Sequence, residues 1–441
     1  MASLAKEWVR PYYLKWGYSR LFADRYPREF TRCWEYPARP VDSTLAGWME
    51  GGGEHSDVLF LPAADWHSRM QRSQHFAMAL ARLGHRCLYL NPHLGREFPH
   101  PYPLSRRAMI SRLLPQVYEL HVHLPREPVY HHRPLTIQEC ASVVSAIERS
   151  FKLAGSANPI VLASLPFWTP VARELKRRHG YRVIYDCHDL WSGFGRMHPG
   201  ILSAEQELFE LSDAVVFSAR WLMDQKRALH NELESKSSTI RNAVQPEDFD
   251  FRNRRNGTGR RTVGYAGSLD FWFDVDTVRL AAERHPEWDF VLFGRVEGYE
   301  IQRLRELPNI RLMGEVAYPS LRKHFASVDV CMIPFRLSPL TLATNPLKLY
   351  EYFACGHPVV SSALPEVLEF GDLVYVAREP REFLAQLERA MAENDPHLRH
   401  GRRRLAEQET WIARGKSLAS YFHSEIPSGS HMADVPHALA G

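Results

Sequence analysis

Apolar runs alternate with amphipathic stretches along most of the chain, and this alternation predicts strands separated by helices. In the first half, the strand pattern VLFLPAADW is followed by a helical pattern from about Gln71 to Leu83 and by the strand RCLYLNP. Further strands are expected at VYELHVHLP, PIVLASL, RVIYDCHD and AVVFSA, with helices over about 136–153, 169–179 and 203–211. Such alternation favours a parallel sheet with helices on both faces.

The same alternation resumes after a polar, basic and glycine-containing stretch, PEDFDFRNRRNGTGRR, which is typical of an exposed linker. The strands expected beyond it are TVGYAGSL, WDFVLFG, NIRLMGEV, DVCMIPF, HPVVSSA and DLVYVA, with helices at about 275–284, 299–306, 318–326, 347–354 and 380–393. The chain is therefore predicted to be an α/β protein with two Rossmann-like, doubly wound parallel-sheet domains. Ligands of such sheets bind at the carboxyl ends of the strands, so we expect these ends to face one another across a cleft.

Domain boundaries follow from these changes of pattern. The expected parts are an N-terminal extension (1–56), a first domain (57–245), a linker (246–261), a second domain (262–400), a C-terminal helical segment (401–424) and a small polar tail (425–441). Within the tail, SGSHM at 428–432 looks like a remnant of a cloning site.

The composition is that of an ordinary globular protein without a strong overall charge. Hydrophobic residues make up 45% of the 441 residues, and 55 basic residues against 51 acidic ones give a net charge of +4. A general field that recruits nucleic acid is therefore not expected. The six cysteines form no Cys-x-x-Cys pair and no zinc-finger spacing, which suits a reducing compartment, and no His/carboxylate cluster suggests a metal site.

A cytoplasmic location is expected, because no stretch reaches the roughly 18 apolar residues of a membrane span and the N-terminus lacks the apolar core of a signal peptide. The first 20 residues interleave bases such as Lys6 and Arg10 with aromatics such as Trp8 and Tyr12. This composition suits a lipid headgroup layer, so peripheral association with the inner membrane face stays open. Packing of the aromatics on the first domain is the alternative, and we prefer it.

The segment 341–360, TLATNPLKLYEYFACGHPVV, carries the most specific chemistry. A helix that opens near Pro346 points free backbone N–H groups and the positive end of its dipole at an anion, with Lys348 in the first turn. Glu351 lies three residues further on, where its carboxylate can accept hydrogen bonds from two adjacent sugar hydroxyls. Together these groups suit a nucleotide diphosphate sugar, although an ordinary αβ unit with one lysine and one glutamate is the alternative.

This segment resembles the donor-site signature of GT-B glycosyltransferases, in which a Pro-x-Lys-x-x-Glu-like turn and helix precede a Gly-x-Pro-Val-Val strand entry. The resemblance extends roughly over residues 57–424. It implies the GT-B fold, a donor held by the second domain, a hydroxyl acceptor held by the first, and a C-terminal helix that crosses back to the first domain. It also implies that the leaving group is neutralised without a metal or a cofactor.

Other positions match the family's donor site less closely. The resemblance suggests that Gly267 and Ser268 form a phosphate turn, that Arg295 grips phosphate, and that the base lies near Val316 and Ala317. Thr344 and Asn345 offer hydrogen bonds to sugar hydroxyls or phosphate. For Arg295 a solvated side chain, and for Val316 a plain connection, are the alternatives.

Three departures from the family pattern affect the expected mechanism. Ser268 and Asp274 stand where many retaining relatives have an arginine and a lysine, which places more of the charge neutralisation on Lys348 and Arg295. Ala343 stands where the first glutamate of a Glu-x7-Glu pair would be. An inverting mechanism is therefore favoured over a retaining one.

Inversion requires a base, and YDCHDLW at 185–191 delivers titratable groups to the end of a strand. Asp189 is the first choice for this base and His188 the second, with helix capping and backbone hydrogen bonding as the alternative. In the loop AADWHSRMQR, Asp65 is the fallback base. Trp66, His67 and Arg69 of the same loop could bind the acceptor or cap the following helix. Arg72 is a further cation of this loop that could bind an anionic acceptor.

The prediction is a glycosyltransferase that moves a sugar from a nucleotide diphosphate sugar to a hydroxyl of a glycan, a lipid-linked acceptor or a small molecule. A nucleotide-sugar epimerase on the same fold and a catalytically silent GT-B scaffold protein are the alternatives. Asn242 and Phe249, in a segment similar to the family's hinge signature, are expected to be structural.

Overall fold

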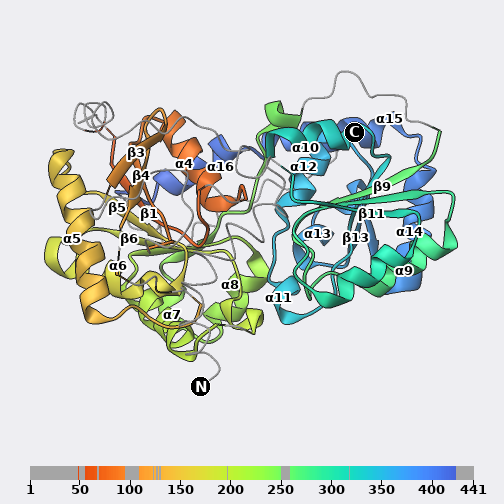
Figure 1. Cartoon of the computed structure of the whole chain (residues 1–441). Coiled ribbons are helices and arrows are strands. Elements are labelled where there is room, and N and C mark those ends of the chain that lie inside the picture. The colour runs from red at the N-terminus through yellow and green to blue at the C-terminus, as the bar shows by residue number, and fades with distance from the viewer. Residues whose placement is uncertain are drawn as a thin grey trace. The chain divides into compact units, whose positions relative to one another are not determined.

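The computed structural model describes residues 48, 55–66, 69–94, 109–122, 124–125, 128, 131–195, 197–249, 259–316 and 318–423. These residues form two compact units, each built around its own sheet (Figure 1). The first unit contains the described residues up to Phe217, Lys226–Ile240 and those from Gly415 onward. The second contains Ser218–Gln225 and Arg241–Arg414, so the chain passes between the units more than once.

The first unit has an eight-stranded sheet in the order β3-β4-β2-β1-β5-β6-β7-β8, with only β3 antiparallel to its neighbour among the described strands. The central strands are buried along their whole length, as expected for a parallel sheet covered on both faces. The strands are β1 (Val58–Leu61), β2 (Cys87–Leu90), β3 (Met109–Leu114), β4 (Val117–His121), β5 (Ile160–Ala163), β6 (Val183–Cys187), β7 (Ala214–Phe217) and β8 (Ser237–Thr239).

Helices of the first unit follow the predicted amphipathic stretches closely. They are α4 (Arg72–Arg82), α5 (Ile137–Leu153), α6 (Thr169–His179) and α7 (Pro199–Leu211), with 3-10 turns η2 (Pro166–Trp168), η3 (Trp191–Phe194) and η4 (Asn231–Leu233). Thr136 and Glu139 form a capping box that fixes the start of α5. Helix α8 (Arg220–Arg227) begins in the second unit and ends in the first.

The second unit has a six-stranded sheet with every described pair parallel, in the order β11-β10-β9-β12-β13-β14. This is a doubly wound order whose direction reverses between β9 and β12, and the carboxyl ends of these two strands are where such sheets bind ligands. The strands are β9 (Thr262–Ala266), β10 (Asp289–Phe293), β11 (Ile310–Gly314), β12 (Val330–Ile333), β13 (Val359–Ser362) and β14 (Tyr375–Ala377).

Most helices of the second unit match the prediction, but two short helices, Pro339–Leu342 and Pro365–Leu368, were not predicted, and two predicted helices differ from the structure. The helices of this unit are α9 (Val275–Arg284), α10 (Tyr318–Phe325), α11 (Pro339–Leu342), α12 (Leu347–Cys355), α13 (Pro365–Leu368), α14 (Pro380–Met391) and α15 (Pro396–Gln408), with 3-10 turns η5 (Pro246–Phe249), η6 (Tyr299–Glu306) and η7 (Gly371–Leu373). The helix predicted at 299–306 is therefore a 3-10 segment. The helix predicted over 401–424 is divided into α15 and α16 (Trp411–Ala419), because the chain turns at Glu409, whose φ and ψ are not helical.

Candidate active site

Helix α12 begins as its sequence predicts. Pro346 is the residue before its first turn, and Lys348 lies within that turn. The Lys348 ammonium is 3.0 Å from Glu351 Oε2, and the two side chains are 25% and 1% exposed. Burial raises the pKa of Glu351, and the Lys348 charge partly offsets this. A partly exposed cation at a helix N-terminus, held by a buried carboxylate, is suited to bind an anion.

The structure changes the interpretation of Glu351 and Asn345. Glu351 was expected to face a sugar, but its buried side chain serves as the counter-ion of Lys348. The Asn345 side-chain amide lies 3.2 Å from Tyr350 Oη and 3.2 Å from Glu366 Oε2, and its Oδ1 accepts from the backbone N–H of Asn242. Both side chains therefore support the start of α12, and a direct contact of either with a sugar stays a prediction.

The turn after β9 approaches α12 closely. The Tyr352 hydroxyl of α12 accepts from the Ala266 backbone N–H at 2.9 Å, which fixes the helix beside the end of β9. Gly267 leaves no room for a side chain, because a Cβ there would lie 2.4 Å from the Tyr265 hydroxyl. Gly267 and Ser268, the predicted phosphate turn, directly follow the strand end that contacts α12.

A glycine contact between the ends of β9 and β10 gives a testable prediction. Gly294 has φ +145°, and a Cβ there would lie 1.7 Å from the carbonyl oxygen of Gly267. We expect Gly294→Ala to destabilise the second unit by roughly 1–3 kcal/mol, as measured by chemical denaturation. Gly371→Ala is the control, because Gly371 also has positive φ but open space around it; an equal loss in both variants would contradict the role assigned to the contact.

The remaining donor-site predictions fall on three separate loops of the second unit. Arg295 is 47% exposed and pairs with Glu297 at 2.5 Å, so its charge is shared at the protein surface. Val316 follows β11 and is half-buried, and the neighbouring Ala317 lies outside the described residues. The Thr344 hydroxyl donates to the Leu340 carbonyl at 2.9 Å.

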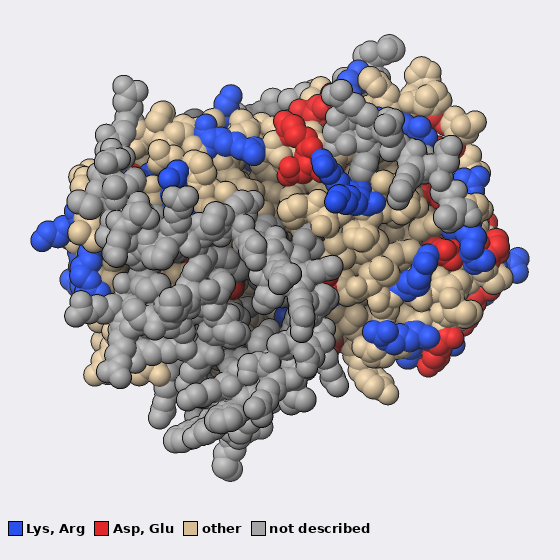
Figure 2. Space-filling view, turned by 45° about the horizontal axis from the view of Figure 1, so that its top comes forward, with Lys and Arg blue, Asp and Glu red and all other residues tan. Residues whose placement is uncertain are grey.

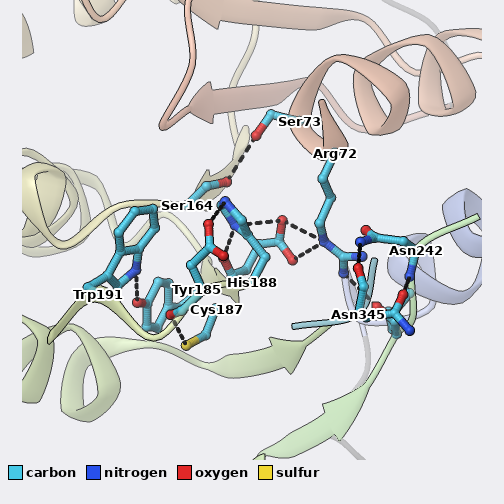
Figure 3. Close-up of polar contacts among 12 residues, drawn as sticks. Arg72, Ser73, Ser164, Tyr185, Cys187, His188, Trp191, Asn242 and Asn345 are labelled. Carbon is cyan, nitrogen blue, oxygen red and sulfur yellow. Dashed lines mark hydrogen bonds and ion pairs between the residues drawn. The ribbon is translucent and has the colours of Figure 1, made fainter. Parts of the chain in front are cut away.

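The strongest candidate for a base lies after β6 in the first unit (Figure 3). His188 Nε2 is 3.5 Å from Asp189 Oδ2, and His188 Nδ1 is 3.1 Å from the Asp186 carbonyl oxygen. The Asp189 side chain is 29% exposed, yet the protein around its carboxyl is dense enough that burial raises its pKa, with His188 acting in the opposite direction. A carboxylate with a raised pKa is a better general base than an ordinary aspartate.

Asp186 and Arg72 have a structural role in the same region. The Arg72 guanidinium donates from Nε to both carboxylate oxygens of Asp186, at 2.9 and 3.1 Å, and from Nη2 to the Ile240 carbonyl. Arg72 is 4% and Asp186 0% exposed. Arg72 is therefore an internal brace between α4, β6 and the last residue before the second unit. The suggestion that it binds an anionic acceptor was wrong.

The loop after β1 is more deeply buried than predicted. Trp66 is 1% exposed and packs edge-on against Tyr89, so it is a core residue and cannot stack on a sugar. Asp65 is 8% exposed and accepts from Asn91 Nδ2 at 3.3 Å. Arg69 is half-buried, and its backbone carbonyl accepts a hydrogen bond from the side chain of Gln74 in the first turn of α4. His67 lies outside the described residues.

Two polar clusters were not found from the sequence. In the first unit, Asn91 Nδ2 also donates to Glu119 Oε1 at 2.8 Å, and His121 Nε2 lies 2.8 Å from the other Glu119 oxygen. In the second unit, the carboxylate of Glu366 accepts from the Arg220 backbone N–H and from Arg241 Nε. The only sequence signal was a polar residue within an apolar strand or after a proline, and this signal does not identify its partners.

The described surface carries both signs of charge, interspersed on the face shown in Figure 2, in keeping with the small net charge. Within the described parts of the chain, no three His, Cys, Asp or Glu side chains are grouped so that they could hold a metal ion. None of the helices that the structure describes has the length and apolar character needed to cross a bilayer.

Comparisons with known proteins agree with this arrangement. Residues 260–393 match the model of the family Glycosyl transferases group 1. Two solved structures have the same fold over most of the chain. Sucrose-phosphate synthase from Thermosynechococcus elongatus has a TM-score of 0.64 at 16% identity and covers 83% of this chain and 98% of its own. Anabaena HepE, solved with UDP and glucose, has a TM-score of 0.59 at 15% identity and covers 84% of this chain and 100% of its own.

A relative in sequence is TuaH of Bacillus subtilis, named as a teichuronic acid biosynthesis glycosyltransferase, which is 28% identical over 266 residues. The match covers 54% of this chain and 66% of TuaH, just under two thirds of the relative. The predicted GT-B fold is confirmed, and residues 260–393 are similar to the group 1 glycosyl transferases. These findings support the glycosyltransferase prediction and do not favour the epimerase or the silent scaffold.

Proposed function

We propose that this protein is a glycosyltransferase that moves a sugar from a nucleotide diphosphate sugar to a hydroxyl group of a glycan. The observation that carries the proposal is the cation site at the start of α12, where Lys348 is held by the buried Glu351, on a helix whose Tyr352 contacts the end of β9. The leaving diphosphate gains negative charge in the transition state, and such a site stabilises that charge more than it stabilises the bound donor.

The proposed reaction inverts the anomeric centre. Asp189 takes the proton from the acceptor hydroxyl, the acceptor oxygen bonds to the anomeric carbon, and the bond from that carbon to the diphosphate oxygen breaks with its electron pair on the leaving group. Inversion is supported by Ala343, because this alanine stands where a second donor-side carboxylate would be. Lys348, Arg295 and the α12 N-terminus would supply the positive charge without a metal ion.

The acceptor class is proposed from the relative in sequence. TuaH is named for the biosynthesis of teichuronic acid, and we propose that the acceptor here is likewise a growing cell-surface polysaccharide. A cytoplasmic protein that meets a lipid-linked acceptor at the inner membrane face fits this proposal. Sedimentation with anionic liposomes, compared with neutral ones, tests the membrane contact.

Calorimetric binding of UDP, GDP and dTDP, without added metal, tests the donor site. Lys348→Ala is expected to weaken the selected nucleotide about tenfold, or about 1.4 kcal/mol, because the cation nearest to the α12 N-terminus is lost. Lys348→Arg keeps the charge and should retain most of the affinity. Lys152→Ala, which removes an exposed lysine of α5 in the first unit, is the control for net charge.

Equal nucleotide affinity of the wild type and Lys348→Ala would contradict the donor site proposed at the start of α12.

Incubation of a nucleotide sugar with and without a glycan acceptor separates the competing functions. An epimerase converts the donor without an acceptor, a scaffold leaves it unchanged, and the proposed enzyme releases nucleotide diphosphate only as the product glycan forms.

A further inference from the structure

A chain of buried polar side chains adjoins His188 in the first unit (Figure 3). The indole N–H of Trp191 donates to the Tyr185 hydroxyl at 3.0 Å, and this hydroxyl lies 2.9 Å from Glu205 Oε1. The other oxygen of Glu205 accepts from Lys226 Nζ at 2.5 Å. We call these four residues the Tyr185 chain; they come from η3, β6, α7 and α8.

The direction of the hydrogen bonds in the Tyr185 chain is fixed by burial. Tyr185 is fully buried, and desolvation raises its pKa well above the usual value, so its hydroxyl keeps its proton. This hydroxyl donates to the Glu205 carboxylate, which leaves its oxygen free to accept from Trp191. Lys226 and Glu205 are 9% and 8% exposed, so each charge has its partner in the protein interior.

A buried ion pair of this kind is weak evidence for a contribution to stability, because desolvation of two charges offsets their attraction. Its structural effect is orientation. The ammonium holds the carboxylate, the carboxylate holds the phenol, and the phenol sets the position of the indole at the start of η3.

Trp191 in turn packs against His188, the neighbour of the candidate base Asp189. Its ring lies edge-on to the His188 ring, with centroids 5.4 Å apart and an angle of 83°. Trp191 is 6% exposed, so it has little freedom to move away. The imidazole of His188 is thus confined between this indole, the Asp186 carbonyl oxygen and the Asp189 carboxylate.

We propose that Tyr185 and Trp191, held by Glu205 and Lys226, are positioning residues that set the orientation of His188 against Asp189. The catalytic consequence rests on the proposed function, whereas the orientation of His188 can be measured without any substrate. Neither Tyr185 nor Trp191 needs to touch the sugar or the acceptor for this role.

Kinetics of Tyr185→Phe and Trp191→Phe test the catalytic consequence. Tyr185→Phe keeps the ring and removes the hydroxyl, whereas Trp191→Phe removes the indole N–H and leaves a smaller aromatic ring. Both should lower kcat by roughly tenfold to a hundredfold through misplacement of His188 against Asp189. The KM for the donor should stay within about twofold, and the acid limb of the pH–rate profile should move. Tyr181→Phe is the matched control, because Tyr181 is also buried in this unit but lies outside the Tyr185 chain.

Nuclear magnetic resonance of the histidine rings tests the orientation directly, with His188→Gln used to assign the signal. The His188 signal should change in Tyr185→Phe and Trp191→Phe and stay unchanged in Tyr181→Phe. Unchanged His188 signals in both variants would overturn the inference, even if activity falls. Changed signals in a protein that transfers no sugar would support the positioning role and reject the proposed function.

Discussion

Replacement of Arg72 by methionine is expected to lower the free energy of unfolding of the first unit by about 3–5 kcal/mol. Methionine fills much of the same space but leaves the Asp186 carboxylate, which is 0% exposed, without the Arg72 guanidinium. It also leaves the Ile240 carbonyl without the Arg72 Nη2 donor. Urea denaturation followed by circular dichroism measures the loss, and Arg82→Met, at the exposed end of the same helix, should change stability by less than about 0.5 kcal/mol.

The double variant Arg72→Met/Asp186→Asn separates an unpaired charge from lost packing. An amide tolerates burial without a cation better than a carboxylate does, so the double variant should recover a substantial part of the stability lost by Arg72→Met alone. If the two substitutions simply add, the brace does not work through the charge pair, and the loss must come from the space that the guanidinium fills.

The sequence was sufficient to predict both sheets, because nearly all of their strands are continuous apolar runs. β6 and β13 are fully buried, and such runs between amphipathic helices have few other interpretations. The prediction missed both edge strands of the first sheet, β3 (Met109–Leu114), which is antiparallel to β4, and β8, which has only three residues, Ser237–Thr239. The strand character of β8 comes from pairing with β7, and the composition of Ser-Ser-Thr does not reveal it.

The candidate site was predictable where one local motif contains the chemistry. Helix α12 with Lys348 is such a case, since the start of the helix and the cation lie within a few residues of each other. Trp66 and Arg72 were misinterpreted because their partners, Tyr89 and Asp186, are distant in the sequence. Sequence composition cannot distinguish a cation that faces a ligand from one that braces two elements.

Sequence composition also cannot assign the role of Asn345, because an asparagine suits a sugar-binding position and a structural position equally well. Its hydrogen bonds to Asn242, Tyr350 and Glu366 tie the start of α12 to the segment that begins the main part of the second unit. This explains why the start of α12 is well defined although Pro346 provides no side-chain cap. The donor helix is thus supported by residues that the sequence presents as unrelated.

Replacement of Asp189 by asparagine is expected to reduce kcat by about a hundredfold to ten-thousandfold, because the amide cannot take the proton of the acceptor hydroxyl. Burial raises the pKa of the wild-type carboxyl above 3.8, so the acid limb of wild-type activity should lie above this ordinary value. Rates measured between about pH 4 and 9, at saturating donor and acceptor, provide this comparison. Asp224→Asn, which changes an exposed carboxylate of α8, is the control and should retain full activity.

Stability distinguishes loss of the Asp189 base from damage to the fold. A carboxyl whose pKa is raised in the folded state favours folding below its unfolded pKa and loses this contribution as pH rises through the folded pKa. At neutral pH the charged carboxylate is therefore a cost that asparagine removes, and Asp189→Asn should unfold at the same temperature as the wild type or higher. If the variant is instead less stable but keeps its activity, Asp189 is a structural cap, and the role of base passes to His188, whose substitution by asparagine should then abolish transfer.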